Sequence, residues 1–201
     1  MLSSDRIATR SALLQLREEQ AVVQEAYDFL DEKRLLLVAE LLRQLQHYQD
    51  LLVQYAEIHR QASNSLQATV QRHGLEGTQL YPARFQDQAP IHYQRQRFMG
   101  VTLINSEMQL PEAVEREHSG YYTPEASACF GYFQQLVRHN AVLAAVSGNL
   151  HRLLAEYHRT QRRARALENV VMPEIARDVR AMSNQLDEHD QEDVLRAHLR
   201  R

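Results

Sequence analysis

The sequence predicts a mainly α-helical protein in which two long helices form an antiparallel coiled-coil hairpin, joined by a small middle head. Three observations support this fold class. Helix-forming residues dominate the 201-residue chain, which has no tryptophan, 6 glycines and 5 prolines. Such residues lose little rotamer freedom in a helix. Apolar residues recur every seven residues in both terminal parts, and most of the glycines and prolines lie in the middle.

The N-terminal part, residues 1–72, is predicted to be one long helix. Neither proline nor glycine occurs from Asp5 to Arg72. Its sustained heptad stripe is typical of a helix whose narrow apolar seam is covered by a coiled-coil partner. At 1.5 Å per residue this helix would be about 100 Å long. The predicted seam consists of Leu13, Leu16, Gln20, Val23, Tyr27, Leu30, Arg34, Leu37, Leu41, Gln44, Tyr48, Leu51, Tyr55, Ile58 and Ala62.

The C-terminal part, residues 124–201, repeats this pattern over a nearly equal length. Two long helices of matching length joined by an intervening segment are expected to fold back on each other. Polar residues in or beside the seams, among them Gln20, Arg34, Asn140 and Ser147, weaken packing but fix the register. The C-terminal seam is predicted at Leu136, Leu143, Leu150, Tyr157, Ala164, Leu167, Val171, Ile175, Met182 and Leu186.

Pro173 interrupts the C-terminal helical pattern. A proline inside a helix removes one backbone hydrogen bond and should bend the axis. The sequence leaves open whether this bend serves a function or is a tolerated kink.

The middle part, residues 73–123, is predicted to be a small head. Gly74, Gly77, Pro82 and Pro90 begin a run of helix-breaking residues. The stretch 91–104 is rich in aromatic and β-branched residues, with turn signals at positions 99–100 and 105–106. We expect one or two short strands here, or an irregular segment, with a hairpin centred near residue 100.

Composition and motifs exclude several classes of function. A net charge of −3 and a pI near 6.4 argue against nucleic-acid binding. The lone Cys129 excludes an internal disulfide and a thiolate metal cluster, which fits a reducing compartment. The longest uncharged apolar-rich run, 141–150, is too short and too polar to span a bilayer. We therefore expect a soluble, intracellular protein that reaches a membrane only through a partner.

No catalytic motif accompanies this pattern. The chain has neither a phosphate-binding Gly-x-x-x-x-Gly-Lys-Ser/Thr loop nor a Gly-x-Ser-x-Gly nucleophile elbow. A helical di-iron enzyme is a further alternative, since Glu115 and His118 form one Glu-x-x-His spacing. Such sites need two copies, and the chain has one. No metal, cofactor or catalytic activity is expected.

A basic cluster runs into an apolar ridge and a proline in Thr160-Gln-Arg-Arg-Ala-Arg-Ala-Leu-Glu-Asn-Val-Val-Met-Pro173. This segment resembles the C-terminal helix of the D subunit of the V/A-type rotary ATPases, where two arginines precede an Ala-Leu-Glu core. The family usually carries Val-Asn where this chain has Ala164 and Arg165. Three further segments are similar to the family, in the same order along nearly the whole chain: Thr9–Leu16, Leu30–Arg34, and Phe98–Val101 ahead of Pro111.

The resemblance implies a non-catalytic rotor axle. Such an axle couples ATP hydrolysis or synthesis to rotation, and so to proton or sodium transport. The resemblance implies as partners the A and B subunits of the catalytic hexamer, the F subunit of the stalk and the subunit that caps the membrane rotor ring. The expected location is cytoplasmic, peripheral to the membrane through the ATPase complex.

The candidate partner contacts follow from the same resemblance. Arginines suit carboxylate contacts, although Arg159 and its neighbours would also suit a solvated helix face. Periodicity alone fits equally well a stand-alone coiled-coil scaffold or tether. The candidate contacts are Arg10, Lys33, Arg34, Met99, Gly100, Arg162, Arg163, Arg165, Glu168 and Pro173.

Overall fold

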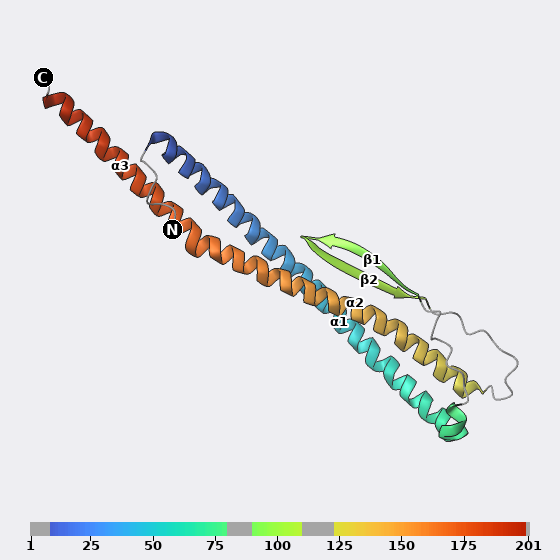
Figure 1. Ribbon diagram of the computed structural model, residues 1–201. Helices are drawn as coiled ribbons and strands as arrows, with labels where there is room; N and C mark the ends of the chain where they lie inside the picture. The colour runs from blue at the N-terminus through green and yellow to red at the C-terminus, as the bar shows by residue number, and fades with distance from the viewer. Residues whose placement is uncertain (1–8, 80–89, 110–122, 200–201) are drawn as a thin grey trace. The chain divides into compact units, whose positions relative to one another are not determined.

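The computed structural model describes residues 9–79, 90–109 and 123–199. In chain order it contains α1 (Arg10–Gln79), β1 (Ile91–Phe98), β2 (Val101–Met108), α2 (Pro124–Ala166), a π-helical segment η1 (Leu167–Val171) and α3 (Met172–Leu199) (Figure 1). The prediction of a mainly α fold, with long N- and C-terminal helices and a small strand-containing middle, is therefore confirmed. The chain divides into two packed units, residues 1–37 with 156–201 and residues 38–155.

The start of α1 is capped by Thr9. The side-chain oxygen of Thr9 accepts a hydrogen bond from the backbone N–H of Ala12 at 3.1 Å, and its carbonyl accepts from Leu13 at 3.0 Å. Threonine is a favoured N-cap because its oxygen satisfies an amide that has no partner inside the helix.

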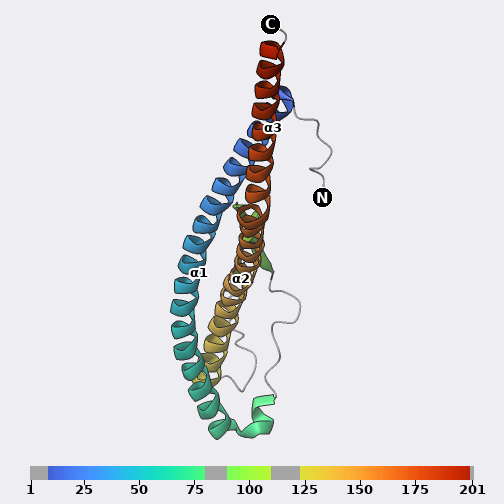
Figure 2. The same cartoon turned by 90° about the vertical axis from the view of Figure 1, so that its left-hand side faces the viewer.

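Gly74 breaks the helix near its far end. Its φ of 70° and ψ of 169° are not helical, and L side chains rarely adopt such a positive φ. The space around it is open, so the backbone conformation rather than crowding favours glycine. Figure 2 shows the break, after which a final helical turn extends α1 to Gln79. The break lies two residues beyond the expected helix end at Arg72.

The start of α2 follows the same logic as that of α1. Thr123 accepts from the backbone N–H groups of Ala126, through its side chain at 3.4 Å, and of Ser127, through its carbonyl at 3.1 Å. Pro124 occupies the first helical position, where a missing N–H costs nothing and the fixed φ already suits a helix.

A π-helical turn accommodates Pro173. The N–H of Met172 bonds to the carbonyl of Leu167, five residues back, instead of the four of an α-helix. A proline ring clashes with the carbonyl four residues earlier, and a wider turn rearranges the backbone at that point. The sequence predicted a bend at this proline and missed the π-helical turn that precedes it.

In the first unit, α1 runs antiparallel to the C-terminal helices. Arg10 pairs with Asp190 and Lys33 pairs with Glu156, so residue numbers rise on one helix as they fall on the other. The seam positions of α1 proposed from sequence between residues 13 and 37 are buried or half-buried, apart from Gln20. Facing burial on the other helices occurs at Thr160, Ala164, Ile175 and Met182.

In the second unit, α1 and α2 are also antiparallel. His139 Nε2 donates to the carbonyl of Leu51 at 2.7 Å, the Thr69 hydroxyl donates to the carbonyl of Glu125 at 3.3 Å, and Arg72 pairs with the Glu125 carboxylate. Apolar residues fill the seam between these polar contacts. The buried apolar side chains of this unit include Leu51, Ala62, Leu136, Val146 and Leu153.

The strands form the hairpin expected near Gly100. They pair antiparallel from Phe98 opposite Val101 to Ile91 opposite Met108. Met99 and Gly100 form the two-residue turn, with φ of 47° and 85°. Positive φ at both central residues is typical of a type I′ turn, whose twist matches that of the strands.

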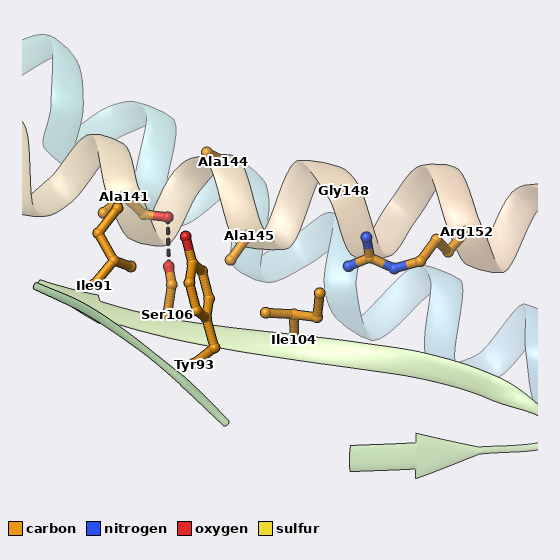
Figure 3. Close-up of a pocket in the computed structure, with 9 residues that line it drawn as sticks. All are labelled: Ile91, Tyr93, Ile104, Ser106, Ala141, Ala144, Ala145, Gly148 and Arg152. Carbon is orange, nitrogen blue, oxygen red and sulfur yellow. Dashed lines mark hydrogen bonds between the residues drawn. The ribbon is translucent and has the colours of Figure 1, made fainter. Parts of the chain in front are cut away.

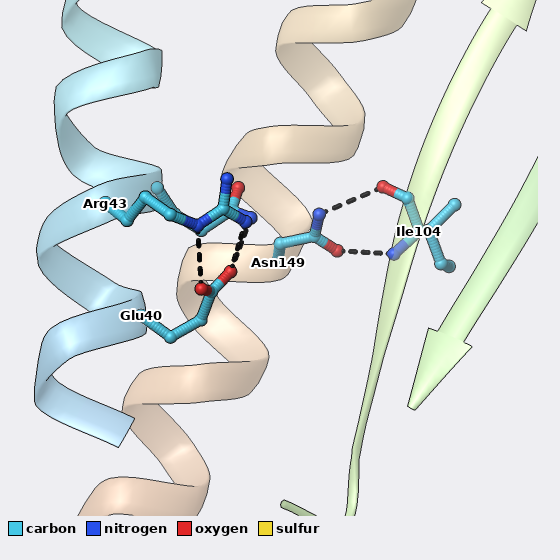
Figure 4. Close-up of polar contacts among 5 residues, drawn as sticks. Glu40, Arg43, Ile104 and Asn149 are labelled. Atoms are coloured by element: carbon cyan, nitrogen blue, oxygen red, sulfur yellow. Dashed lines mark hydrogen bonds and ion pairs between the residues drawn. The ribbon is translucent and has the colours of Figure 1, made fainter. Parts of the chain in front are cut away.

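Asn149 attaches β2 to α2. Asn149 is fully buried, and its carboxamide makes two hydrogen bonds to the backbone of Ile104 (Figure 4). Nδ2 donates to the Ile104 carbonyl at 2.9 Å, and the Ile104 N–H donates to Oδ1 at 2.7 Å. The Ser106 hydroxyl adds a 2.6 Å bond to the carbonyl of Ala141. The two Asn149 bonds satisfy backbone groups on the outer edge of β2, which would otherwise remain unpaired.

Replacing Asn149 with Leu should therefore loosen the hairpin. Two backbone groups of Ile104 would lose their partners, and we expect a destabilisation of about 2–4 kcal/mol in urea unfolding. Hydrogen exchange at the Ile104 amide should accelerate at least about tenfold, in line with the lost protection. Asn140→Ala, at an exposed position of the same helix, is the matched control. Unchanged exchange at Ile104 would show that Asn149 does not hold the strand.

Candidate partner-binding surfaces

The basic segment, defined here as Arg159, Arg162, Arg163 and Arg165, lies at the end of α2. All four arginines are exposed. Arg159 pairs with Glu156 at 3.3 Å, whereas the other three form no ion pair within the described part of the chain. Residues three and four apart share a helix face, so Arg159, Arg162 and Arg163 project together. The unpaired guanidinium groups of Arg162, Arg163 and Arg165 lie in solvent and are available to carboxylates of another molecule.

Small side chains lie on the opposite side of this helix. Thr160 and Ala164 are almost completely buried. One face of this helical segment therefore packs into the interior of the first unit, while the face that carries the arginines lies in solvent.

The η1 turn follows directly and is also exposed. None of its residues is buried, and Val170 is 58% exposed. Glu168 and Pro173 are exposed as well. A π-helical turn leaves backbone groups less regularly paired than in an α-helix, and such turns are frequent at functional sites. The basic segment and η1 together make an exposed stretch that combines charge, an apolar side chain and irregular backbone.

Three other candidate contacts are paired within the chain. Arg10 makes two bonds to the Asp190 carboxylate at 2.9 and 3.2 Å, and Arg34 pairs with Asp31. The Arg10–Asp190 pair is exposed and contributes little to stability, because water screens it. Arg34 and Asp31 are half-buried. Contacts of Arg10 and Arg34 with a partner stay a prediction.

The third of these, Lys33, is more buried. Its ammonium nitrogen lies 2.6 Å from Glu156 Oε1, and both side chains are only 15% exposed. Glu156 also accepts the bond from Arg159, so one carboxylate ties the seam to the basic segment. In the structure the Lys33 ammonium is paired with the Glu156 carboxylate. A contact between Lys33 and a partner protein stays a prediction.

Removing the Glu156 charge tests this link. Glu156→Gln leaves the half-buried Lys33 ammonium without its carboxylate, and we expect a loss of about 1–3 kcal/mol in the free energy of unfolding. Glu192→Gln, which removes an exposed pair with Arg196, should change it by less than about 0.5 kcal/mol. Equal effects of the two substitutions in urea unfolding would contradict a special role for the Lys33 pair.

The candidate contacts in the hairpin lie at its tip. Met99 is 39% exposed and Gly100 is exposed in the turn between the strands. The turn is accessible, and the thioether of Met99 is a flexible apolar group of the kind found at binding surfaces.

A buried polar cluster interrupts the seam of the second unit. Arg43 donates to Glu40 through Nε at 2.8 Å and Nη2 at 2.6 Å (Figure 4). Gln44 Nε2 donates to Glu40 Oε1 at 2.9 Å. The hydrogen bond from Arg43 lowers the pKa of Glu40 below its ordinary value and outweighs the opposing effect of burial; the Gln44 bond lowers it further. The heptad pattern predicts Gln44 in the seam but does not include Glu40.

The lowered pKa of Glu40 predicts a pH-dependent contribution to stability. A carboxyl with a lowered pKa in the folded state stabilises the protein above its ordinary pKa, and this stability is lost as the pH falls through the lowered value. Glu40→Gln should cost about 1 kcal/mol at neutral pH, and the difference from wild type should shrink below about pH 4.5, the ordinary value for glutamate. Urea unfolding across this pH range measures both effects.

Glu57 provides a matched control for Glu40. It bonds Arg60 and Gln61 at the same spacing, but in an exposed position, so Glu57→Gln should have a smaller effect. A constant difference between wild type and the Glu40 variant at all pH values would contradict the assignment.

Several residues buried or half-buried in the seam lie outside the predicted seven-residue spacing. His139, Val146, Leu153 and Thr160 follow by three residues the seven-spaced positions of α2, and Leu153 and Thr160 are almost fully buried. Alternating steps of three and four, in place of steps of seven alone, would have found them. Asn149 had no such signal, because its partner is the backbone of a distant strand.

One helix also carries more apolar residues than its seam uses. In the second unit, Leu42, Leu45, Leu52 and Val53 of α1 remain between 40% and 73% exposed. Leu42, Leu45 and Leu52 follow steps of three and seven, a spacing typical of a surface that a helical partner can cover.

The remaining sequence predictions concern metals and membranes. Among the residues that the structure describes, no cluster of three or more histidine, cysteine or acidic side chains is arranged to bind a metal ion. The Glu115–His118 pair lies outside those residues. Within the same ranges, no helix has both the length and the apolar character that a membrane crossing requires.

These features define a class of protein: a mainly α-helical protein built on long antiparallel helices, with exposed apolar and basic surfaces. Comparison with known proteins identifies the family. The family model for the ATP synthase D subunit matches residues 12–199, and the chain belongs to this family.

Relatives span nearly the same length. The D subunit of the V-type ATP synthase of Thermotoga neapolitana is 23% identical, over 94% of this chain and 93% of the relative. The A-type D subunit of Thermococcus sibiricus is 26% identical over 94% and 89%, and the V-type D subunit of Anaeromyxobacter dehalogenans is 27% identical over 94% and 91%. The chain is thus similar from end to end to the D subunits of V- and A-type ATP synthases.

Proposed function

We propose that this chain is the central rotor axle of a V/A-type ATPase or ATP synthase and carries out no catalysis itself. The observation that carries the proposal is the family match over residues 12–199. The long antiparallel helices, together with the exposed basic segment and η1, suit a component that transmits force by contact. Rotation of this axle would couple ATP hydrolysis or synthesis to proton or sodium transport.

The partners in this proposal are those of the assembly. The A and B subunits would surround the end of the helical pair, while the F subunit of the stalk and the cap of the membrane rotor ring would contact other parts. The protein would then be cytoplasmic and held at the membrane through the complex. The exposed apolar residues of α1, Leu42, Leu45, Leu52 and Val53, supply a surface for such a partner.

The basic segment suits contact with the hexamer. Its unpaired guanidinium groups project from one side of the helix only, so the surface presented to a surrounding ring changes as the axle turns. A ligand or partner shifts a conformational equilibrium only as far as it interacts differently with the two states. An axle with one charged side would thus favour different states in successive catalytic sites.

A stand-alone coiled-coil scaffold is the second candidate. The exposed stripe of α1 fits it as well, because heptad spacing only requires some helical partner. The two functions differ in the partner they need.

Co-expression with the A, B and F subunits from the same genome separates them. The axle proposal expects co-elution of a single copy with the hexamer in size-exclusion chromatography, and an altered ATPase rate. A chain that folds but does not associate would favour the scaffold.

Neutralising the basic segment tests the proposed contact. Replacing Arg162, Arg163 and Arg165 together with Gln should weaken association with the hexamer about 5- to 30-fold, or about 1–2 kcal/mol, because charge-assisted bonds are lost. Arg17→Gln, at an exposed position of α1, is the control for loss of one arginine elsewhere and should leave association unchanged. Unchanged association of a folded triple variant, verified by circular dichroism, would exclude the segment as a contact.

A further inference from the structure

A groove lies between the hairpin and α2, within the second unit. Its volume is about 250 Å³. Ile91, Tyr93 and Ile104 line it from the hairpin, and Ala144, Ala145 and Gly148 line it from the helix (Figure 3). The groove is open to solvent, since Tyr93 is 60% and Ile91 is 40% exposed.

The walls of the groove are mainly apolar. Ala144, Ala145 and Gly148 on α2 carry at most a methyl group, which is too small to fill the space in front of them. Ser106 contributes a hydroxyl group, but this group already donates to the carbonyl of Ala141 at 2.6 Å (Figure 3). Apolar side chains of another molecule would therefore find a preformed surface here.

Arg152 closes one end of the groove with a cation. Its guanidinium lies over Gly148, where an added Cβ would be 3.3 Å from Nη1. Nη2 donates to Asn149 Oδ1 at 2.6 Å, whereas Nε is buried and has no hydrogen-bond partner. Since Nε is buried and Nη2 is bonded to Asn149, Nη1 is the nitrogen that can meet an acceptor from another molecule. A carboxylate is an acceptor that a guanidinium binds strongly.

Further positive charge extends along β1. Arg95 and Arg97 follow Ile91 and Tyr93 on the same face of the strand, and both arginines are exposed. Neither forms an ion pair with any residue that the structure describes. No acidic residue lines the groove.

We propose that this groove is the docking site for an acidic, apolar-faced polypeptide segment of a partner protein. Aliphatic side chains of the segment enter between Tyr93 and the small residues of α2, and a carboxylate pairs with Nη1 of Arg152. Additional carboxylates pair with Arg95 and Arg97. A polypeptide is favoured over a single small carboxylate because the cations are spread along the strand, so several linked acids bind them together. The inference does not depend on the axle function.

A designed peptide tests the site in the full-length chain. The probe is fluorescein-labelled Gly-Leu-Glu-Leu-Glu-Leu-Glu-Gly, with glutamine in place of glutamate in the matched neutral peptide, and binding is followed by fluorescence anisotropy. The acidic peptide should bind at least about tenfold tighter, and less so as salt rises from about 0.05 to 0.5 M. In NMR spectra, the resonances of Ala144, Ala145 and Gly148 should shift. Equal binding of the two peptides, or shifts elsewhere only, would overturn the proposal.

Variants separate the groove from general attraction to positive charge. Arg152→Gln should lower the affinity about tenfold, because the charge-assisted bond is lost. Ala144→Gln fills the groove from an exposed position without removing charge, and should lower affinity as well. Arg180→Gln, an exposed arginine of α3, should leave it unchanged. If the Ala144 variant melts like wild type and binds equally well, the groove is not the site.

Discussion

Burial of a narrow apolar seam is the constraint on which this structure depends. A long helix with apolar residues on one stripe gains little stability in isolation, because most of its side chains stay in water. In each unit the seam of α1 is covered by an antiparallel segment from the C-terminal half, with Leu37 and Leu153 fully buried. The large share of exposed surface that remains is what makes contact with other proteins possible.

Polar residues inside the seam determine alignment more than they add stability. Glu40, Gln44 and Asn149 are buried, and each satisfies its polar atoms within a defined set of partners. A shift of one helix along the other would leave such groups unpaired, which is costly. Asn149 also holds β2 beside α2, so the position of the hairpin follows from the same rule. The groove beside Arg152 exists because this attachment places a strand against a helix face of small residues.

Charge and backbone irregularity are concentrated where the seam is least apolar. Around Thr160 and Ala164 the buried side chains are small, while the basic segment faces solvent and the π-helical turn follows. Pro173 accounts for the turn, since a proline excludes regular α-helical bonding before it. Half-buried Lys33 and Glu156 link this region to α1. The region therefore combines local anchoring with an exposed face available to partners.

Sequence alone determined the helical class, the positions of the long helices and the Met99–Gly100 hairpin, because heptad spacing and turn residues act over short distances. It also indicated the family. Only the tertiary structure showed that Lys33 is paired with Glu156, that Asn149 binds the backbone of Ile104, and that a groove lies beside Arg152. These features join residues 45 to 123 positions apart. Such contacts arise when separate elements pack together, and no local pattern in the chain encodes which side chains then meet.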